Sequence, residues 1–296
     1  MGKNNKETYW KEQASEEEIR FTQPDIMLKL VSTVDDRGWP HITMISSNRL
    51  IGNKELVWGQ FTEGSSKEFV KKNPKQGIFY MTAEMPFKYL QVKANFSHTT
   101  IEGEDLEHFN KSNLMRYFTY VRVHTAYYNT IKAITKVRNL PLSGVIVGIL
   151  KNIIGKGAAK TKLPEKRLNI IGFNLFKAPI AVRVISYIDP EDLYPLMIPC
   201  LQLQAADHNR LVFPLSIAKK DLIKIPENTK IAVFGMNFEF ANQVVKGTFI
   251  GFKKFRGIKL GVIEIEEVYN GAPPLIGTIY PEIQTTPKIT KFSLEK

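Results

Sequence analysis

The chain has 296 residues, 43% hydrophobic and 24% charged, a composition typical of a soluble globular protein with one large or two ordinary domains. Its only cysteine, Cys200, excludes an internal disulfide framework, and the charged amino-terminal stretch MGKNNKETYWKEQASEEE lacks the apolar core of a secretory signal. We therefore expect a cytoplasmic location. The formal charge of +12 favours an anionic partner, which would be a ligand, a membrane surface or a nucleic acid.

The first predicted elements are helical. Residues 1–20 form an amino-terminal segment with a helix from Ser15 to Arg20, because a serine followed by acidic residues is a helix-start pattern. Pro24 suits the first turn of a second helix, from Asp25 to Leu30.

The stretch from Val31 to Phe96 has the pattern of short β-strands around one helix. Turn residues at 35–38 and 52–53 predict two hairpins, because Asp, Asn and Gly favour tight turns. The predicted strands span residues 31–34, 41–46, 46–50, 56–61, 77–82 and 89–96, and the helix spans 66–72. This order is the outline of a small antiparallel barrel.

A helical and basic stretch follows, over residues 105–167. Residues 105–136 have a helical pattern, although Phe118 to Val123 is as strand-like as it is helical. From 136 to 167 there are eight basic residues and one acidic residue, Glu165. A second helix is predicted at 142–154, with these apolar residues on one face: Leu142, Val145, Ile146, Ile149, Leu150, Ile153 and Ile154.

Two interpretations of this stretch remain open. In the first, the 142–154 helix packs on the barrel and a basic loop follows it. In the second, residues 142–162 form an interfacial helix whose lysines meet an anionic surface, which would be a peripheral membrane contact. Thirteen residues are too few to span a bilayer, which takes about 20.

The second half of the chain repeats the first. β-Favouring runs return after Asn169, at IIGFNLF and PIAVRVISYI, and Tyr194–Phe213 then aligns with Trp39–Trp58 without a gap. Farther on, Gln243-Val244-Val245-Lys246 corresponds to Gln91-Val92-Lys93. A repeat of this length indicates two copies of one supersecondary unit.

The first copy resembles a known family. T-x-D-x-x-G-x-P-H from Thr33 to His41, F-T-x-x-S-S-K from Phe61 to Lys67, then Asn-Pro and a Gln-Val strand are similar to the FMN-binding split barrel of the pyridoxamine 5′-phosphate oxidase-like proteins. The resemblance implies a mostly β (α+β) fold of two tandem split β-barrel units, at 21–104 and 168–296. A helical insertion at 105–167 would separate them.

Members of this family are usually homodimers with flavin between two barrels, so the resemblance implies that this chain is its own pseudo-dimer. Further homodimerisation stays open. The second copy lacks the D-x-x-G-x-P hairpin and the Ser-Ser pair, which indicates one complete flavin site and one degenerate copy. The implied cofactor is FMN; the superfamily also includes proteins that use deazaflavin F420 or haem, and we expect these less.

The resemblance also implies which residues bind the cofactor. The phosphate would meet Thr62, Ser65, Ser66 and Lys67. The isoalloxazine ring would meet Phe61, Gln91 on the partner-side strand, and the backbone of Ile42, Thr43, Met44 and Ile45. Thr43 and Ser66 stand where the oxidases carry basic residues, which weakens the case for oxidase activity. Without the family pattern, TEGSSKE would be an ordinary capped helix start and Gln91 a solvent-facing strand residue.

Other catalytic patterns are not found in the sequence. The five histidines have no metal-ligand spacing, Cys200 is expected to be a buried small hydrophobe, and no G-x-S-x-G, P-loop or Rossmann pattern is present. Any chemistry would come from a cofactor, and no metal site or catalytic residue is predicted.

Two hypotheses for function follow. In the first, the chain is an FMN-binding flavoprotein, an oxidoreductase acting on a small-molecule substrate. In the second, it is a non-catalytic split-barrel binding module whose basic helical insertion engages an anionic partner or membrane surface. No specific nucleic acid is expected as a partner.

Overall fold

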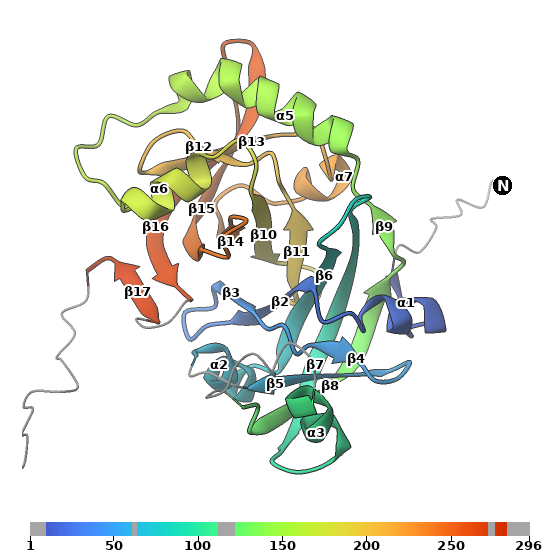
Figure 1. Cartoon of the computed structure of the whole chain (residues 1–296). Coiled ribbons are helices and arrows are strands. Elements are labelled where there is room, and N and C mark those ends of the chain that lie inside the picture. Colours follow the sequence, from blue (N-terminus) through green and yellow to red (C-terminus); the bar gives the residue numbers. More distant parts are fainter. Residues whose placement is uncertain (1–9, 61–63, 112–121, 272–275, 283–296) are drawn as a thin grey trace, which may run out of the picture.

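The protein consists of two curled antiparallel sheets stacked against each other (Figure 1). The structure is a computed structural model that describes residues 10–60, 64–111, 122–271 and 276–282. The first sheet has the strand order β3-β2-β6-β7-β8-β5-β4 and the second β11-β10-β14-β15-β16-β13-β12. Because the two orders are the same, the predicted tandem of two barrel units is confirmed.

The strands of the first sheet are β2 (Met27–Val34), β3 (Pro40–Met44), β4 (Arg49–Leu50), β5 (Glu55–Gln60), β6 (Lys75–Thr82), β7 (Lys88–Thr100) and β8 (Thr125–Thr135). Those of the second are β10 (Val182–Ile188), β11 (Pro195–Pro199), β12 (Gln204–Ala205), β13 (Arg210–Pro214), β14 (Thr229–Met236), β15 (Asn242–Phe255) and β16 (Ile258–Asn270). Three short strands lie beside these paths: β1 (Trp10–Lys11) and β9 (Arg138–Asn139) in the first sheet and β17 (Gly277–Tyr280) in the second.

The helices are α1 (Glu16–Phe21), α2 (Ser66–Lys72), α3 (Glu104–Lys111), α5 (Leu142–Gly155), α6 (Ile170–Lys177) and α7 (Lys219–Leu222), and a 3₁₀ turn, η1 (Lys156–Ala159), follows α5. The prediction for α1 is confirmed, including its capping box between Ser15 and Glu18. The predictions for α2 and α5 are also confirmed.

Three predicted elements are wrong. Asp25–Leu30 is not a helix, because β2 starts at Met27 and pairs on both sides, with β3 and β6. IIGFNLF is not a strand but helix α6, which Asn169 caps by accepting a hydrogen bond from the Gly172 N–H at 2.8 Å. The helix predicted at 105–136 is confirmed only at its start, where α3 ends at Lys111, and is wrong at 125–135, which form strand β8 between β7 and β5. Residues 112–121 of that prediction lie outside the described residues.

The place of β8 also moves a unit boundary. The first sheet needs β8 to join β7 to β5, and β9 pairs with β7, so the first barrel extends to Asn139. Between β9 and the first strand of the second sheet, β10, lie α5, η1 and α6.

An approximate two-fold axis relates the barrels. It passes close to Ser32 and Ser186, which occupy equivalent positions on β2 and β10 and whose hydroxyl groups lie 2.8 Å apart. An apolar cluster between the sheets contains residues of both, among them Leu30, Phe79 and Met197. The junction of the barrels is therefore a buried interface fixed within one chain.

Ion pairs cross this interface in a symmetric pattern. Lys246 of β15 lies 2.9 Å from the Asp35 carboxylate, at the end of β2, and 3.3 Å from Glu267. At the equivalent position, Lys93 of β7 pairs with Asp189 at 3.2 Å, just after β10. Each barrel therefore holds the other through a lysine on its long strand.

The two barrels approach each other closely at Gly77. A Cβ atom there would overlap the carbonyl oxygen of Pro195, the first residue of β11. Gly77→Ala is therefore expected to lower the free energy of unfolding by about 1–3 kcal/mol, because backbone on both sides would have to move. Chemical denaturation measures the change.

Gly52 supplies the matched control, because nothing lies within 4 Å of a Cβ atom there. Gly52→Ala should change stability by no more than about 0.5 kcal/mol. Equal effects of the two substitutions would contradict the close approach at Gly77.

Candidate functional site

Helix α2 lies across one face of β3 and places two of the predicted residues in contact. The hydroxyl oxygens of Thr43 and Ser66 lie 2.7 Å apart, and the Phe69 ring packs edge-on against the His41 imidazole with ring centroids 5.4 Å apart. His41 and Thr43 are two positions apart on the strand, and Ser66 and Phe69 are three apart on the helix. The two spacings match, so one helix face covers one strand face.

His41 is the buried polar group of this site that lacks a partner. Only 1% of the residue is exposed, and neither Nδ1 nor Nε2 has a hydrogen-bond partner within the described residues. Its ring also meets Tyr269 of the second barrel, with centroids 4.7 Å apart. Burial, with a further contribution from Lys246, lowers the pKa of His41 to about 3. The ring is therefore neutral at pH 7, with one N–H and one lone pair unused.

Strand β3, which carries this imidazole, is at the end of its sheet, and no other strand of the described residues pairs with its outer edge. The Asp35 N–H bonds to the Trp39 carbonyl at 2.8 Å and the Ile45 N–H to the Lys29 carbonyl at 2.9 Å. Because hydrogen-bonded and non-bonded pairs alternate in an antiparallel ladder, the N–H and C=O groups of Ile42 and Met44 point away from β2. The Ile42 side chain lies in the apolar cluster between the barrels.

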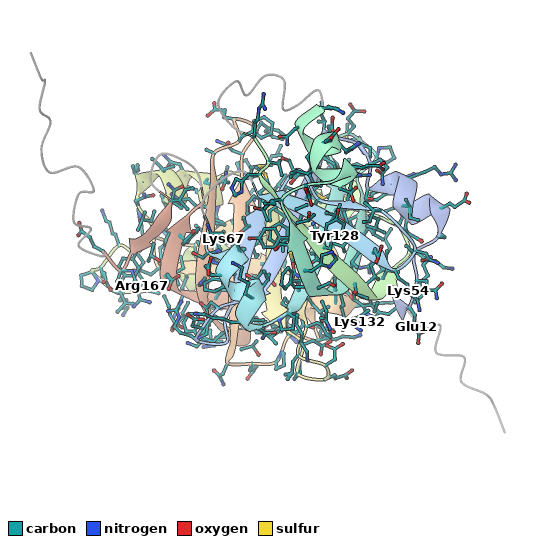
Figure 2. All side chains as sticks on the ribbon, turned by 90° about the horizontal axis from the view of Figure 1, so that it is seen from below. Glu12, Lys54, Lys67, Tyr128, Lys132 and Arg167 are labelled. Atoms are coloured by element: carbon teal, nitrogen blue, oxygen red, sulfur yellow. The ribbon has the colours of Figure 1, made fainter. Side chains whose placement is uncertain are left out.

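The other residues predicted on this side are placed as follows. Ser65 is half-buried at the start of α2, and its side chain makes no capping hydrogen bond. Figure 2 shows Lys67 on α2. Phe69, on the same helix, contacts His41, and His41 contacts Tyr269 of the second barrel. The Ile45 side chain belongs to the core of the first barrel. Phe61 and Thr62 lie outside the described residues.

Gln91 does not join this group. It is buried, so the alternative of a solvent-facing strand residue is wrong. Its amide nitrogen donates to the carbonyl of Met197 on β11, and its amide oxygen accepts a hydrogen bond from Arg138 at 2.6 Å. Gln91 therefore occupies the strand edge of the second copy that corresponds to the outer edge of β3. Strand register places Val244, rather than Gln243, at the equivalent position of Gln91.

We call the region of β3, α2 and His41 the first junction, and the equivalent region of β11 and Gln91 the second junction. A cavity of about 600 Å³ opens at the second junction. Leu196 stands there where the first junction has His41, and Ala133 lies beside Lys93 as Glu267 lies beside Lys246. At the second junction Ala133 leaves space where the larger Glu267 stands at the first, and at the first junction the His41 ring contacts those of Phe69 and Tyr269. The cavity is lined by Trp10, Gln91, Lys93, Ala133, Tyr187, Asp189, Pro190, Glu191, Asp192, Leu196, Ile198, Asp221 and Lys224.

The charge of this cavity differs from what a phosphate needs. Four carboxylates line it against two lysines. Burial raises the pKa of Asp221, although Arg138 at 3.2 Å opposes that shift. At the first junction the Thr43–Ser66 hydroxyl pair is of the phosphate-binding type, and Lys67 follows Ser66 on the same helix.

Sequence reasoning missed two features of these junctions. His41 was part of the family pattern but was assigned no role, and its burial between two barrels could not be seen in one copy. The cross-barrel lysines had a usable signal, because Lys93 and Lys246 were already aligned in the repeat. The acidic partners after β2 and β10 would have completed that pattern.

No family model matches the chain, and no curated protein matches its sequence. Solved structures are similar to a part of it. An FMN-binding protein from Syntrophomonas wolfei subsp. wolfei shares 17% identity, with a TM-score of 0.35, over 40% of this chain and 82% of its own. A protein of the pyridoxinephosphate oxidase family from Clostridium acetobutylicum, related to general stress protein 26 of B. subtilis, shares 14%, with a TM-score of 0.30, over 40% and 87%. An F420 reductase shares 15%, with a TM-score of 0.32, over 42% and 98%.

Each match covers about two fifths of this chain, the length of one barrel. The prediction of two tandem units is confirmed by the common strand order of the two sheets. The matches, at 14–17% identity and TM-scores of 0.30–0.35, are a distant likeness to one barrel.

Proposed function

We propose that the chain binds FMN at the first junction, between β3 and α2, and works as a flavin-dependent oxidoreductase on a small molecule. The observation that carries the proposal is the buried imidazole of His41, whose two ring nitrogens have no partner within the described residues. Leaving a buried polar group unsatisfied costs about 1–3 kcal/mol, so a ligand that satisfies His41 gains that amount.

The residues present fit both ends of the cofactor. Lys67, Ser65 and the Thr43–Ser66 hydroxyl pair would hold the phosphate, a dianion that needs a cation and hydroxyl donors. The edge of the flavin ring alternates donors and acceptors, which suits His41 and the outward N–H and C=O groups of Ile42 and Met44. The flavin, once bound, would supply electron transfer.

His41 would position the ring rather than move protons. With its pKa at about 3, the imidazole stays neutral from pH 5 upwards and donates one hydrogen bond and accepts another. Phe69 and Tyr269, packed on its two sides, exclude water from it. This chain's own residues therefore bind and orient the cofactor and keep its surroundings dry.

Lys67→Ala is expected to weaken FMN binding about ten- to a hundredfold, because a charge-assisted hydrogen bond is worth about 1.5–3 kcal/mol. Riboflavin has no phosphate, so its affinity should hardly change. Titration of the apoprotein followed by flavin fluorescence measures both constants.

Three control variants locate the site. Lys219→Ala and Lys220→Ala remove the corresponding lysines of the second copy, and Ala133→Phe fills the cavity at the second junction. All three should leave FMN affinity unchanged. Loss of binding with Ala133→Phe but not with Lys67→Ala would move the site to the second junction. A colourless protein that takes up no added FMN would overturn the proposal.

A further inference from the structure

Helix α5 packs on the second barrel through its smallest residues. Its buried residues are Val145, Gly148, Asn152 and Gly155, which recur at helical spacing. A Cβ atom at Gly148 would overlap Gln202 and Ser216, and Asn152 donates to the Gln202 carbonyl. Gly144 and Gly148 therefore let α5 lie close to the barrel, because a Cβ atom at either would overlap it, and the helix lies across the top of the molecule in Figure 1.

The large apolar residues of α5 are on the other side. Ile146, Leu150 and Ile153 are 60%, 56% and 61% exposed, at spacings of four and three. With Val147 and Ile154, also exposed, they form what we call the outer ridge. The first interpretation of this helix is right in that it packs on a barrel. The apolar face predicted from the sequence, however, is mostly turned to the outside.

The stretch Leu142–Ala159 is long and apolar enough to cross a membrane by length and composition. Its packing indicates a different position. Asn152 bonds to Gln202, and Lys156 donates to the Gln204 side chain at 2.8 Å, so polar contacts fix the inner face on the barrel. Because its inner face is held on the barrel, this helix can contact a membrane only through its outer ridge.

Lysines follow the outer ridge in the chain. Lys160, Lys162 and Lys166 are exposed and make no ion pair within the residues that the structure describes. Glu165, the acidic residue among them, lies 3.5 Å from Arg167. More apolar side chains are exposed in the same segment, at Leu163, Ile170 and Ile171. An exposed apolar ridge followed by unpaired cations is the composition of a membrane-surface helix.

We propose that the outer ridge and these three lysines dock the second barrel on the surface of an anionic lipid bilayer. The charge of these lysines favours an anionic bilayer over a second copy of this chain as the partner. A second copy would bring its own lysines to the contact, whereas anionic headgroups complement them, by about 1 kcal/mol per lysine.

Flotation with vesicles tests the proposal on the full chain. The protein should float with vesicles of phosphatidylcholine mixed with phosphatidylglycerol, and much less with phosphatidylcholine alone. The ridge variant Ile146→Ser/Leu150→Ser/Ile153→Ser should bind about a thousandfold more weakly, at about tenfold for each of three aliphatic side chains that insert into the bilayer. The charge variant Lys160→Glu/Lys162→Glu/Lys166→Glu should lose at least a hundredfold at low salt, and this difference from the unchanged protein should shrink at higher salt, which screens the attraction to the headgroups.

The matched control is Ile26→Ser/Ile101→Ser, which removes two isoleucines that are 79% and 77% exposed on the first barrel. It should bind vesicles as the unchanged protein does. All variants alter exposed side chains, so their thermal unfolding should match, and flotation then reports binding alone.

A second measurement shows which face touches lipid. Cys200 is buried, so a single engineered cysteine can be labelled selectively. An environment-sensitive dye at Leu150→Cys should shift to the blue with anionic vesicles, and the same dye at Ile101→Cys should not. Equal shifts, vesicle binding unaffected by the ridge variant, or a dimer in solution that only the ridge variant dissociates would each overturn the proposal. So would binding to nucleic acid but not to vesicles.

Discussion

Lys246→Met is expected to lower the free energy of unfolding by about 3–5 kcal/mol, the usual cost of breaking a buried ion pair from one side. The side chains of Lys246 and Asp35 are both almost fully buried, at 4% and 5% exposure. Without the lysine, Asp35 and Glu267 remain as two buried carboxylates, with Arg37 as their cation. Because the pair joins the two barrels, denaturation should also begin at the interface.

The control for this prediction is Lys72→Met. Lys72 and Asp36 form an ion pair of similar length, 2.7 Å, but both side chains are exposed. Its loss should cost no more than about 1 kcal/mol. Similar losses for Lys246 and Lys72 would show that the buried pair does not hold the barrels together. The double variant Asp35→Asn/Lys246→Met should recover part of the loss.

The same pair sets a pH dependence. Burial alone would raise the pKa of Asp35, but hydrogen bonds from Lys246, Trp39 and Arg37 lower it below its ordinary value. A carboxyl group with a lowered pKa in the folded state stabilises the protein above its unfolded pKa, which is about 3.9. That contribution is lost as the pH falls below about 4. Lys246→Met should therefore lose less stability over this acidic range than the unchanged protein.

Arg183→Met is expected to lower the free energy of unfolding by at least about 3 kcal/mol, at about 1 kcal/mol or more for each of three carbonyl groups left without a donor. Arg183 is fully buried on β10. Its guanidinium donates to the carbonyls of Leu201 at 3.1 Å, Leu175 at 2.9 Å and Ala178 at 2.6 Å. Two of these carbonyls belong to the end of α6, so hydrogen exchange should rise there first.

Arg183→Lys should recover only part of this stability, because one ammonium group cannot reach the carbonyl of Leu201 and those at the end of α6 together. The first barrel shows what a lysine does at this position: Lys29 donates to the Thr22 carbonyl, at the end of α1, at 3.0 Å. Lys177→Met is the control, since Lys177 is exposed in the last turn of the same helix. If it destabilises α6 as strongly as Arg183→Met, the buried contacts are not the cause.

The sequence by itself determined the elements that local chemistry specifies. The hairpin turn at 35–38, helix α2 with its stop before Pro74, and the capping box of α1 depend on residues a few positions apart. The repeat was also visible, because the two units bury similar patterns of side chains in the same order. For the same reason the candidate residues Thr43 and Ser66 could be chosen, and the structure brings them into contact.

Only the tertiary structure decided between helix and strand where apolar runs were short. The first half of β2, β8 and α6 were predicted in the other state, because a short stretch with several apolar residues suits both helix and strand until its neighbours are known. The partners of Gln91 depended on a contact between the barrels, and the outward face of α5 depended on how the helix packs on the second barrel. Such contacts join residues far apart in the chain, and no local pattern specifies them.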